Sequence, residues 1–362
     1  MLKKAKIAVL RIAGSTGLTR LAMRSTWRRN RLLILAYHGT SIDDEHQWDS
    51  SLYLPPATLR ARLNLIRTAG CNVLPLDTAV RLLYRSELPP RSVVLTFDDG
   101  PHDFYTQAFP IVRSFGFPVT VYLTTYYAAH NRPVYDVMLR YLLWKSRHPT
   151  LCWPEVLGTE AEVPLSGSAS PSVLERLQRH PGEHSLTGAQ KDSLLCRLAE
   201  LLEVDYQAIL RKRLLHIMSL DEVRELAAQG VDFQLHTHRH GVSLYKAVFQ
   251  REIADNRALL KTAGSLAARH FCYPGGVHRP QFLPWLREWD IASATTCELG
   301  LASRQCDALL LPRLVDTGSL TEHEFVGWLS GVAALLPKRP YVEGPGQFLE
   351  ERLGSGCLVG LT

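Results

Sequence analysis

The sequence predicts an α/β fold with parallel strands, either an open sheet or a barrel, over most of its 362 residues. Short continuous apolar runs recur along the chain, and such runs are typical of strands buried on both faces. Between them lie amphipathic segments whose apolar residues are three and four positions apart, as expected of helices. Strands that alternate with helices favour a parallel arrangement, because each helix carries the chain back to the start of the next strand.

The first half of the chain contains three strong strand signals. The apolar runs are Leu32–Tyr37, Ser92–Phe97 and Val119–Thr124, and a shorter strand is expected at Val73–Leu76. The helices between them are indicated by apolar residues at helical spacing that precede a glycine: Leu59, Leu63 and Ile66 before Gly70, and Ala108, Ile111, Val112 and Phe115 before Gly116. Glycine favours the left-handed backbone conformation in which many helices end.

The alternation is interrupted between about residues 130 and 213, which read as a mainly helical insertion. This insertion contains Tyr135, Tyr141, Trp144 and Trp153. These aromatic residues would either form a small core of the insertion or line a wall beside the active site on which a sugar could stack. We favour the core, because aromatic residues at helical spacing are usually buried.

The strand and helix alternation resumes after the insertion. Ser219 and Glu222 form a capping box that opens a helix, and Gly230 ends that helix. The remaining strands are expected at Val231–Leu235, His270–Tyr273, Ile291–Thr295 and Leu309–Leu311, and a closing helix at Phe325–Leu336. We therefore expect one domain over residues 32–336, followed by a peripheral tail over residues 337–362.

Composition and charge exclude several classes of protein. Apolar residues make up 46% and charged residues 21%, so a disordered or collagenous chain is excluded. The net charge is +6, and residues 1–42 hold nine lysines and arginines but no acidic residue. The predicted basic arm, residues 1–31, would contact an anionic membrane surface or remain a solvated, frayed end. No nucleic-acid recognition motif accompanies the arm, so nucleic acid is not an expected partner.

Cysteine usage and the absence of sorting signals bear on localisation. The seven cysteines are odd in number and include no C-x-x-C pair, which favours a reducing compartment. We find no apolar run of transmembrane length and no signal-peptide pattern. The expectation is a cytoplasmic protein, with the basic arm at the inner face of the membrane, although a cell-envelope location stays open.

Polar clusters follow four of the expected strands at the point where each strand ends. They are His38, Asp98-Asp99, His236 with His240, and Pro274-Gly275-Gly276. The carboxyl ends of parallel strands form one mouth, where catalytic groups gather. Clusters that are more than 200 residues apart in the chain can therefore converge on a single site.

The residue types in these clusters suit a catalytic metal. Adjacent side chains diverge on an extended backbone, so one of Asp98 and Asp99 can face a metal while the other faces a water molecule. His236 and His240 are four residues apart, and on a helical turn both could reach one ion. One carboxylate and two imidazoles form a three-ligand set with an open position, as in catalytic sites. The second aspartate could then act as a general base.

Two motifs carry a resemblance to a known family. The segment Thr96-Phe97-Asp98-Asp99-Gly100, followed by His236-Thr-x-x-His240, resembles the NodB-homology polysaccharide deacetylases of carbohydrate esterase family 4. The resemblance covers about residues 32–129 and 214–335 and also includes Tyr37-His38, Phe271–Gly276 and Ala292–Thr296. It implies a distorted (β/α) barrel, here with a helical insertion, and a divalent metal ion that assists removal of N-acetyl groups from glycans.

The resemblance also implies a role for each matching residue. Asp98 would be the general base, and Asp99 would bind the metal together with His236 and His240. The metal would be Zn²⁺, with Co²⁺ or Ni²⁺ as alternatives. His238 lies between the two histidine ligands, and we interpret it as a structural residue.

Two positions depart from the family pattern. Cys272 stands where the family has an arginine that orients the base, and Gly275 stands where it has a tyrosine. Arg313, expected after the last strand, could supply a guanidinium to Asp98 from another direction, or could form only a surface salt bridge. The backbone N–H of Gly275 could stabilise an oxyanion, because that role needs no side chain.

The general acid is less clearly indicated. The family's late Leu-x-His motif, whose histidine protonates the leaving amine, is not recognisable in this sequence. His38 is the best substitute because it ends the first strand, although it could also be a buried histidine with no catalytic role. His102 and His278 lie near the motifs and are weaker candidates.

These features predict a metal-dependent hydrolase that removes N-acetyl groups from an oligosaccharide or polysaccharide. The main alternative is a glycan-binding pseudoenzyme that keeps the metal site without turnover, and the arginine missing at Cys272 and the unrecognised Leu-x-His histidine support this alternative. An amidohydrolase-type site, suggested by His236-Thr237-His238, ranks lower because such a motif opens a barrel and too few residues follow it here.

Overall fold

The computed structural model describes residues 2–165, 171–265, 267–338 and 349 of the chain. Seven parallel strands form its centre. In order around the barrel they are β1 (Leu33–Tyr37), β12 (Leu311–Val315), β11 (Ser293–Leu299), β10 (His270–Cys272), β9 (Asp232–Leu235), β6 (Thr120–Leu123) and β5 (Ser92–Asp99). Pairing of β1 with β5 closes the barrel, and the short β4 (Asn72–Val73) pairs with the start of β5. The predicted (β/α) barrel is confirmed.

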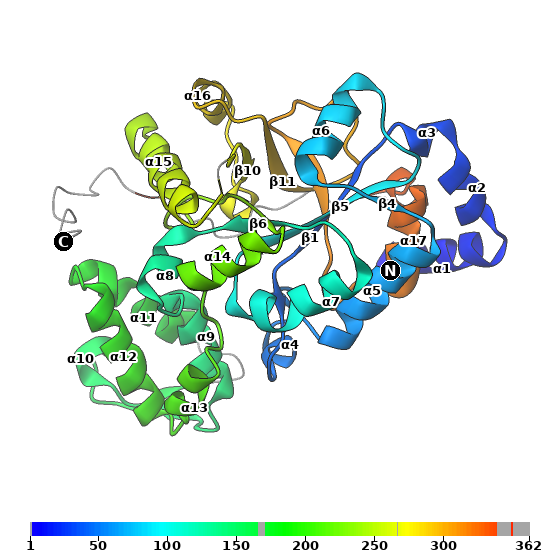
Figure 1. The fold of residues 1–362 in the computed structure, drawn as a ribbon. Helices are drawn as coiled ribbons and strands as arrows, with labels where there is room; N and C mark the ends of the chain where they lie inside the picture. The colour runs from blue at the N-terminus through cyan, green and yellow to red at the C-terminus, as the bar shows by residue number, and fades with distance from the viewer. Residues whose placement is uncertain (1, 166–170, 266, 339–348, 350–362) are drawn as a thin grey trace.

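Helices cover the barrel and return the chain from strand to strand (Figure 1). They are α5 (Pro56–Thr68), α6 (Leu76–Arg85), α7 (Phe109–Phe115), α14 (Leu220–Ala228), α15 (Lys246–Thr262), α16 (Phe282–Glu288) and α17 (Glu322–Ser330). The capping box predicted at Ser219 and Glu222 is confirmed, because both reciprocal hydrogen bonds are present at the start of α14. A short π-helix, η1 (Phe104–Ala108), leads into α7.

Alternate residues of the strands fill the barrel interior. Ile34, Val94, Tyr122 and Cys272 come from four different strands and belong to one buried cluster, against which α6 packs. Side chains two residues apart on a strand face the same side. Asp98, four residues after Val94 on β5, therefore faces the interior of the barrel.

The last barrel strand lies later in the chain than predicted. The sequence predicts a strand at Leu309–Leu311, whereas β12 begins at Leu311 and continues through Arg313. The sequence-based prediction ends the strand before Pro312, because proline has no N–H to donate to a neighbouring strand and usually ends the strand it occurs in. Here β11 has a register irregularity beside Pro312, the kind of position where proline is tolerated. Arg313 is thus part of the barrel wall and does not follow it.

The insertion has a hydrophobic core of its own. Its helices are α8 (Thr125–His130), α9 (Tyr135–Lys145), α10 (Pro154–Leu157), α11 (Pro171–Glu183), α12 (Gly188–Leu201) and α13 (Tyr206–Arg211), with a small antiparallel pair β7 (Thr150–Leu151) and β8 (Val163–Pro164). Tyr141 and Trp153 are buried in this core, while Tyr135 and Trp144 are half-buried against it. The core interpretation of the aromatic residues therefore holds.

The insertion also contacts the segment that follows β1. This segment contains β2 (Gly39–Thr40), α4 (Glu45–Trp48) and β3 (Tyr53–Leu54), and β2 pairs with β3. The ring of Trp48 packs edge-on against Tyr141, and the Tyr141 hydroxyl donates a 2.6 Å hydrogen bond to Asp44. These contacts attach the insertion beside the carboxyl end of β1, where His38 lies.

The basic arm is folded. Residues 2–29 form α1 (Leu2–Ser15), α2 (Leu18–Arg24) and α3 (Thr26–Arg29), and both α1 and α2 pack against α17. Arg28 is completely buried and donates to the carbonyl oxygens of Leu329 at 2.9 Å, Arg31 at 2.7 Å and Ser92 at 3.2 Å. Burial lowers the pKa of Arg28 to about 10. The frayed alternative is wrong for these residues, because three backbone carbonyls fix Arg28.

Three further expectations concern membrane-spanning helices, the C-terminal tail and the cysteines. Each helix among the described residues is too short or too polar to cross a bilayer. The predicted tail, residues 337–362, lies outside the described residues except for 337, 338 and 349. The six cysteines in the described part of the chain are all free, and Cys357 lies outside that part.

Candidate metal centre and catalytic residues

The two aspartates at the end of β5 have different surroundings. Asp98 is buried inside the barrel, with 2% of its surface exposed, whereas 31% of the Asp99 side chain is exposed. Asp99 has a left-handed backbone, with φ of 67°, and Gly100 follows with φ of 76°. This backbone turn directs the second carboxylate away from the first, as the adjacency of the two residues predicts.

Asp99, His236 and His240 bring three metal-ligand atoms together. Asp99 Oδ1 lies 3.0 Å from His236 Nε2 and 3.1 Å from His240 Nε2. Ligand atoms from these residues all lie within 4.8 Å of one another. A carboxylate oxygen and two imidazole nitrogens suit Zn²⁺ or a similar divalent ion and leave coordination positions open. The donor set therefore fits the expected metal.

A hydrogen bond on its other ring nitrogen orients His236 for this role. His236 Nδ1 lies 2.8 Å from the carbonyl oxygen of Cys272 and donates its hydrogen to it, so Nε2 is the ring nitrogen that faces Asp99. The backbone N–H of His236 donates to Asn256 Oδ1 at 2.9 Å. Asn256 Nδ2 in turn donates to the carbonyl of Leu123 at 2.9 Å. These bonds tie the end of β9 to α15 and β6.

Residues 236–240 form a loop and not the helical turn expected from their spacing. Thr237 and His240 both have left-handed backbones, with φ of 60° and 58°, and this geometry brings the two imidazoles together. Such conformations persist when the surrounding structure fixes them. His238 contacts Thr125 Oγ1 at 3.0 Å through Nδ1, and burial lowers the pKa of His238 to about 4. This contact agrees with a structural role for His238.

Arg313 forms a two-bond pair with Asp98. Arg313 Nη1 donates to Asp98 Oδ1 and Nη2 donates to Oδ2, each at 2.8 Å, and both side chains are buried. Nη2 also lies 3.1 Å from Cys272 Sγ, and Nε donates to the carbonyl of Thr296 at 2.9 Å. Because the Cys272 side chain is short, it leaves room for the Arg313 guanidinium to reach Asp98 inside the barrel from β12. The alternative of a surface salt bridge for Arg313 is wrong.

Two opposing effects act on the pKa of Asp98. Burial raises the pKa, because a buried carboxylate loses its hydration. The charge and hydrogen bonds of Arg313 outweigh burial, with smaller help from His38, so the pKa of Asp98 lies below its usual value. The carboxylate is therefore ionised at neutral pH.

His38 and Gly275 also lie at the carboxyl ends of strands. His38 Nε2 is 3.9 Å from Asp98 Oδ2, and 21% of the His38 side chain is exposed. Gly275 has φ of 58° and lies in the short 3₁₀ helix η2 (Pro274–Gly276) that follows β10. A left-handed backbone favours glycine, so glycine suits the conformation at this position.

The two weaker general-acid candidates pair with other carboxylates. His102 Nδ1 lies 3.0 Å from Glu222 Oε1, on α14. His278 Nε2 lies 3.6 Å from Glu298 Oε1, on β11. Of the histidines considered as general acids, only His38 is paired with Asp98 or Asp99 among the described contacts.

Sequence reasoning missed three buried polar residues that support the site. Asn256 holds His236, and Glu252 accepts a 2.7 Å hydrogen bond from the backbone N–H of Arg239. Asp103 accepts a 2.7 Å bond from the N–H of Thr40, and burial raises the pKa of Asp103. A signal existed for Asn256 and Glu252, since both fall on the apolar face of their helix. That face also carries Phe249, Ile253 and Leu260.

Comparison with known proteins identifies the family. A family profile described as polysaccharide deacetylase matches residues 85–184 and 204–294, more than half of the chain. The chain belongs to the polysaccharide deacetylase family. The resemblance drawn from the Asp98-Asp99 and His236/His240 motifs is therefore confirmed. The gap between the two matched segments lies inside the helical insertion.

One similar protein is the poly-beta-1,6-N-acetyl-D-glucosamine N-deacetylase of Escherichia coli (strain K12). It is 32% identical over 101 residues, which cover 27% of this deacetylase-family chain and 14% of the relative. The match thus spans about a seventh of the relative's length. The predicted enzyme class, a hydrolase of carbon–nitrogen bonds, is that of this named relative.

Solved structures share the fold. The Streptococcus pyogenes deacetylase PplD, in complex with acetate, is 17% identical and has a TM-score of 0.55. The alignment covers 85% of this chain and 99% of that one. IcaB from Ammonifex degensii is also 17% identical, with a TM-score of 0.50 over 83% of this chain and 97% of that one. At these identities the comparison establishes the common barrel.

Proposed function

We propose that this deacetylase-family protein is a metal-dependent N-deacetylase of an N-acetylated glycan. The observation that carries the proposal is the joint placement of two units at the carboxyl end of β5. The Asp99, His236 and His240 cluster would hold a divalent metal ion. The adjacent Asp98, fixed by Arg313, would act on the nucleophilic water molecule.

The metal would be held by Asp99 Oδ1 and the Nε2 atoms of His236 and His240. When bound, such an ion polarises the acetyl carbonyl group and makes a water molecule more acidic. The Cys272 carbonyl supports this assignment, because its bond to Nδ1 selects the neutral tautomer of His236 in which Nε2 can coordinate a metal. Zn²⁺ is the proposed ion, with Co²⁺ and Ni²⁺ as alternatives.

The chain's own residues would handle the protons. Asp98 accepts a proton from water as its oxygen adds to the acetyl carbon, and Arg313 keeps the carboxylate ionised and oriented. When the carbon–nitrogen bond breaks, protonated His38 donates to the leaving amine nitrogen. The products are acetate and a free amino sugar. The oxyanion role of the Gly275 N–H stays a prediction.

The substrate class follows from the family and from the named relative. The relative acts on a β-1,6-linked polymer of N-acetylglucosamine, so short N-acetylglucosamine oligomers are the first substrates to test. The test is acetate release from these oligomers, measured with chelator and then with added Zn²⁺, Co²⁺ or Ni²⁺. Acetate release that stops with chelator and returns with metal supports the proposal, and release unaffected by thorough chelation contradicts it.

The alternative function is a glycan-binding pseudoenzyme. Two departures from the family pattern favour a pseudoenzyme: the arginine that orients the base is missing at Cys272, and the histidine that serves as general acid is not recognisable in the sequence. Arg313 supplies the first function from another strand, and His38 is positioned for the second. Stoichiometric metal binding and glycan binding without acetate release would favour the pseudoenzyme.

Replacement of Arg313 by glutamine is expected to lower kcat by about 100-fold or more, because Asp98 loses its orientation and its counter-charge. The pKa of Asp98 would rise, since burial would then dominate. Activity requires the ionised carboxylate, so the acid limb of the kcat/KM profile should move to higher pH. Arg313→Lys keeps the charge and should be the milder variant. Both effects are read from full pH–rate profiles.

Loss of one buried partner also destabilises a protein, so this experiment needs a control for folding. Arg28→Gln removes another buried arginine, at the far end of β5, and should lower the unfolding temperature with little change in the pH profile. An unchanged acid limb in Arg313→Gln would contradict the assigned pairing.

Replacement of His38 by glutamine is expected to slow amide hydrolysis by about 100-fold or more, the usual size of a general-acid contribution. The loss should be much smaller for 4-nitrophenyl acetate, whose leaving group needs no protonation. The comparison of the two substrates is the measurement, with His102→Gln and His278→Gln as matched controls. Equal losses on both substrates would show that His38 is not the general acid.

A further inference from the structure

The first two helices direct apolar side chains into solvent. Val9, Ile12, Leu18 and Leu21 are 46%, 61%, 49% and 67% exposed. They are half of the eight large hydrophobic residues that are exposed in the described part of the chain, although they fall within 13 consecutive positions. An apolar group concentrated in this way marks an interaction surface.

Helix α1 has two apolar faces. Leu10 and Ala13 are buried and form the inner face, which packs near Gly327 of α17. Ala5, Ala8, Val9 and Ile12 are exposed and follow the spacing i, i+3, i+4 and i+7, so they form one stripe on the outer face. The fold therefore buries only the inner face of α1, and the outer face has no packing partner among the described residues.

Basic residues are exposed on the same two helices. Lys3, Lys4, Arg11, Arg20 and Arg24 are all exposed on α1 and α2. No acidic residue occurs before Asp43. Apolar side chains flanked by cations, with no carboxylate of the same segment to neutralise them, complement a surface that is apolar inside and anionic outside.

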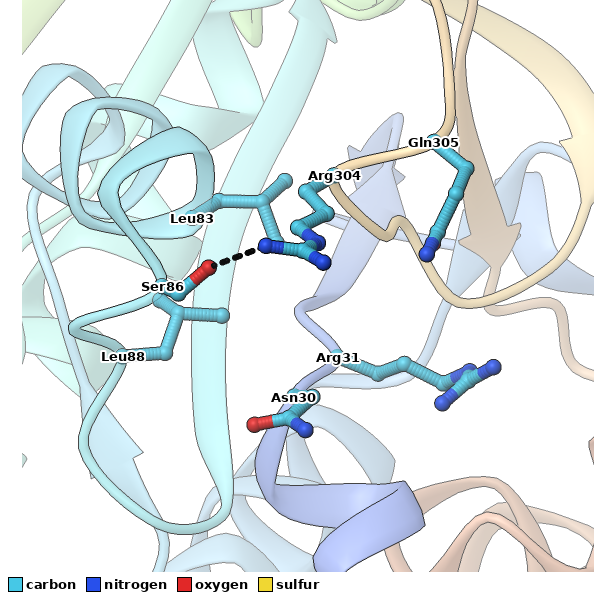
Figure 2. A pocket seen from close by; sticks show the side chains of 7 residues that line it. All are labelled: Asn30, Arg31, Leu83, Ser86, Leu88, Arg304 and Gln305. Atoms are coloured by element: carbon cyan, nitrogen blue, oxygen red, sulfur yellow. Dashed lines mark hydrogen bonds between the residues drawn. The ribbon is translucent and has the colours of Figure 1, made fainter.

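Two hollows at this end of the molecule add further cations. A groove of about 740 Å³ lies between the arm, α5 and α17; Arg91 joins Arg11, Arg20 and Arg24 in its lining, and Glu322 of α17 is its one acidic lining residue. A second hollow, of about 300 Å³, is lined in part by Arg31 and Arg304 (Figure 2). Both hollows are lined by residues outside the proposed metal and base set.

The arm lies at the opposite end of the strands from the metal ligands. Arg28 binds the carbonyl of Ser92, the first residue of β5, whereas Asp99 is the last. Eight residues of strand span roughly 25 Å. In Figure 1 the blue arm helices and the green insertion helices lie on opposite sides of the barrel.

We propose that α1 and α2 bind the protein to the surface of an anionic lipid bilayer. The stripe of Ala5, Ala8, Val9 and Ile12, together with Leu18 and Leu21, would enter the headgroup region, while the flanking lysines and arginines contact lipid phosphates. Bound in this way, the protein holds the carboxyl end of its barrel, with the metal cluster, away from the bilayer.

The charge of the arm favours a bilayer over a second copy of the chain. A two-fold interface would place the same surface against itself. The exposed cations of α1 and α2 would then face each other with no carboxylate of the arm between them. Nucleic acid would complement the charges but would leave the apolar stripe without a partner.

The test is co-sedimentation of the full chain with vesicles. Phosphatidylcholine vesicles that contain phosphatidylglycerol should bind the protein, and added salt should weaken binding, whereas pure phosphatidylcholine vesicles should bind it far less. Arg20→Ala with Arg24→Ala should lower the partition coefficient about tenfold or more, since each surface cation contributes measurably. Ile12→Ser with Leu21→Ser should also lower it about tenfold or more, because two apolar groups no longer enter the membrane.

Matched variants elsewhere on the surface serve as controls. Leu244→Ser with Tyr245→Ser removes two side chains that are 50% and 49% exposed, and Arg251→Ala with Lys261→Ala removes two cations on α15. Each control should bind vesicles like the unaltered chain, and equal unfolding temperatures would show that all variants fold. The proposal is overturned if the intact chain does not sediment with anionic vesicles, or if arm and control variants bind equally. It is also overturned if the arm variants abolish a dimer or nucleic-acid binding and leave vesicle binding intact.

Discussion

Asp98→Asn is expected to remove nearly all acetate release while the protein still binds its metal. Asparagine has almost the same shape as aspartate but cannot accept a proton from water, and loss of a general base costs about 10²–10⁴-fold in rate. The metal cluster should persist because its ligand atoms come from Asp99, His236 and His240. The measurements are kcat for acetate release and metal content on the same protein preparation.

A control variant separates this effect from simple destabilisation. Asp98→Asn also leaves Arg313 buried without its counter-charge, which destabilises the fold. Asp316→Asn disrupts a comparable buried pair, since Arg62 Nε donates to Asp316 Oδ2 at 3.0 Å. It should lower the unfolding temperature by a similar amount with a far smaller effect on kcat. Full activity in folded Asp98→Asn would exclude Asp98 as the base.

His236→Ala is expected to weaken metal binding by at least about 100-fold, more than the loss of a residue that only orients a ligand. Acetate release should fall with metal occupancy and recover in part at high metal concentration. Isothermal titration with Zn²⁺ measures the affinity directly.

His238→Ala is the matched control for the histidine experiment. It alters the same loop and removes a buried imidazole that contacts Thr125, not Asp99. Its zinc affinity should therefore stay much closer to that of the unaltered protein. If His236→Ala and His238→Ala lost affinity equally, the loop as a whole, and not the His236 ligand, would account for the effect.

Most of the barrel could be predicted from the sequence because its strands are buried on both faces. The runs at Leu32–Tyr37 and Ser92–Phe97 are mostly apolar, and each corresponds to a barrel strand. The β12 strand was harder to predict because Pro312 interrupts its pattern. Its position depends on the irregularity in the neighbouring β11, which is a property of the sheet and not of the local sequence.

The candidate site was predictable to the extent that its residues follow strand ends. The Asp98-Asp99 pair and the two histidines stand directly after β-strand signals, so their convergence follows from parallel topology. The pairing of Arg313 with Asp98 joins residues 215 positions apart, and only the fold brings the small Cys272 side chain against both of them. The loop geometry at His240 rests on two left-handed residues that no spacing rule indicates.

The central claim is that two adjacent carboxylates divide the work, with Asp99 holding the metal and Asp98 accepting the proton. It is tested most directly by measuring bound zinc and acetate release side by side in Asp98→Asn and Asp99→Ala. We predict that Asp98→Asn keeps a full equivalent of zinc and releases almost no acetate, whereas Asp99→Ala loses both. Wild-type turnover in Asp98→Asn, or a full equivalent of tightly bound zinc in Asp99→Ala, would contradict this division.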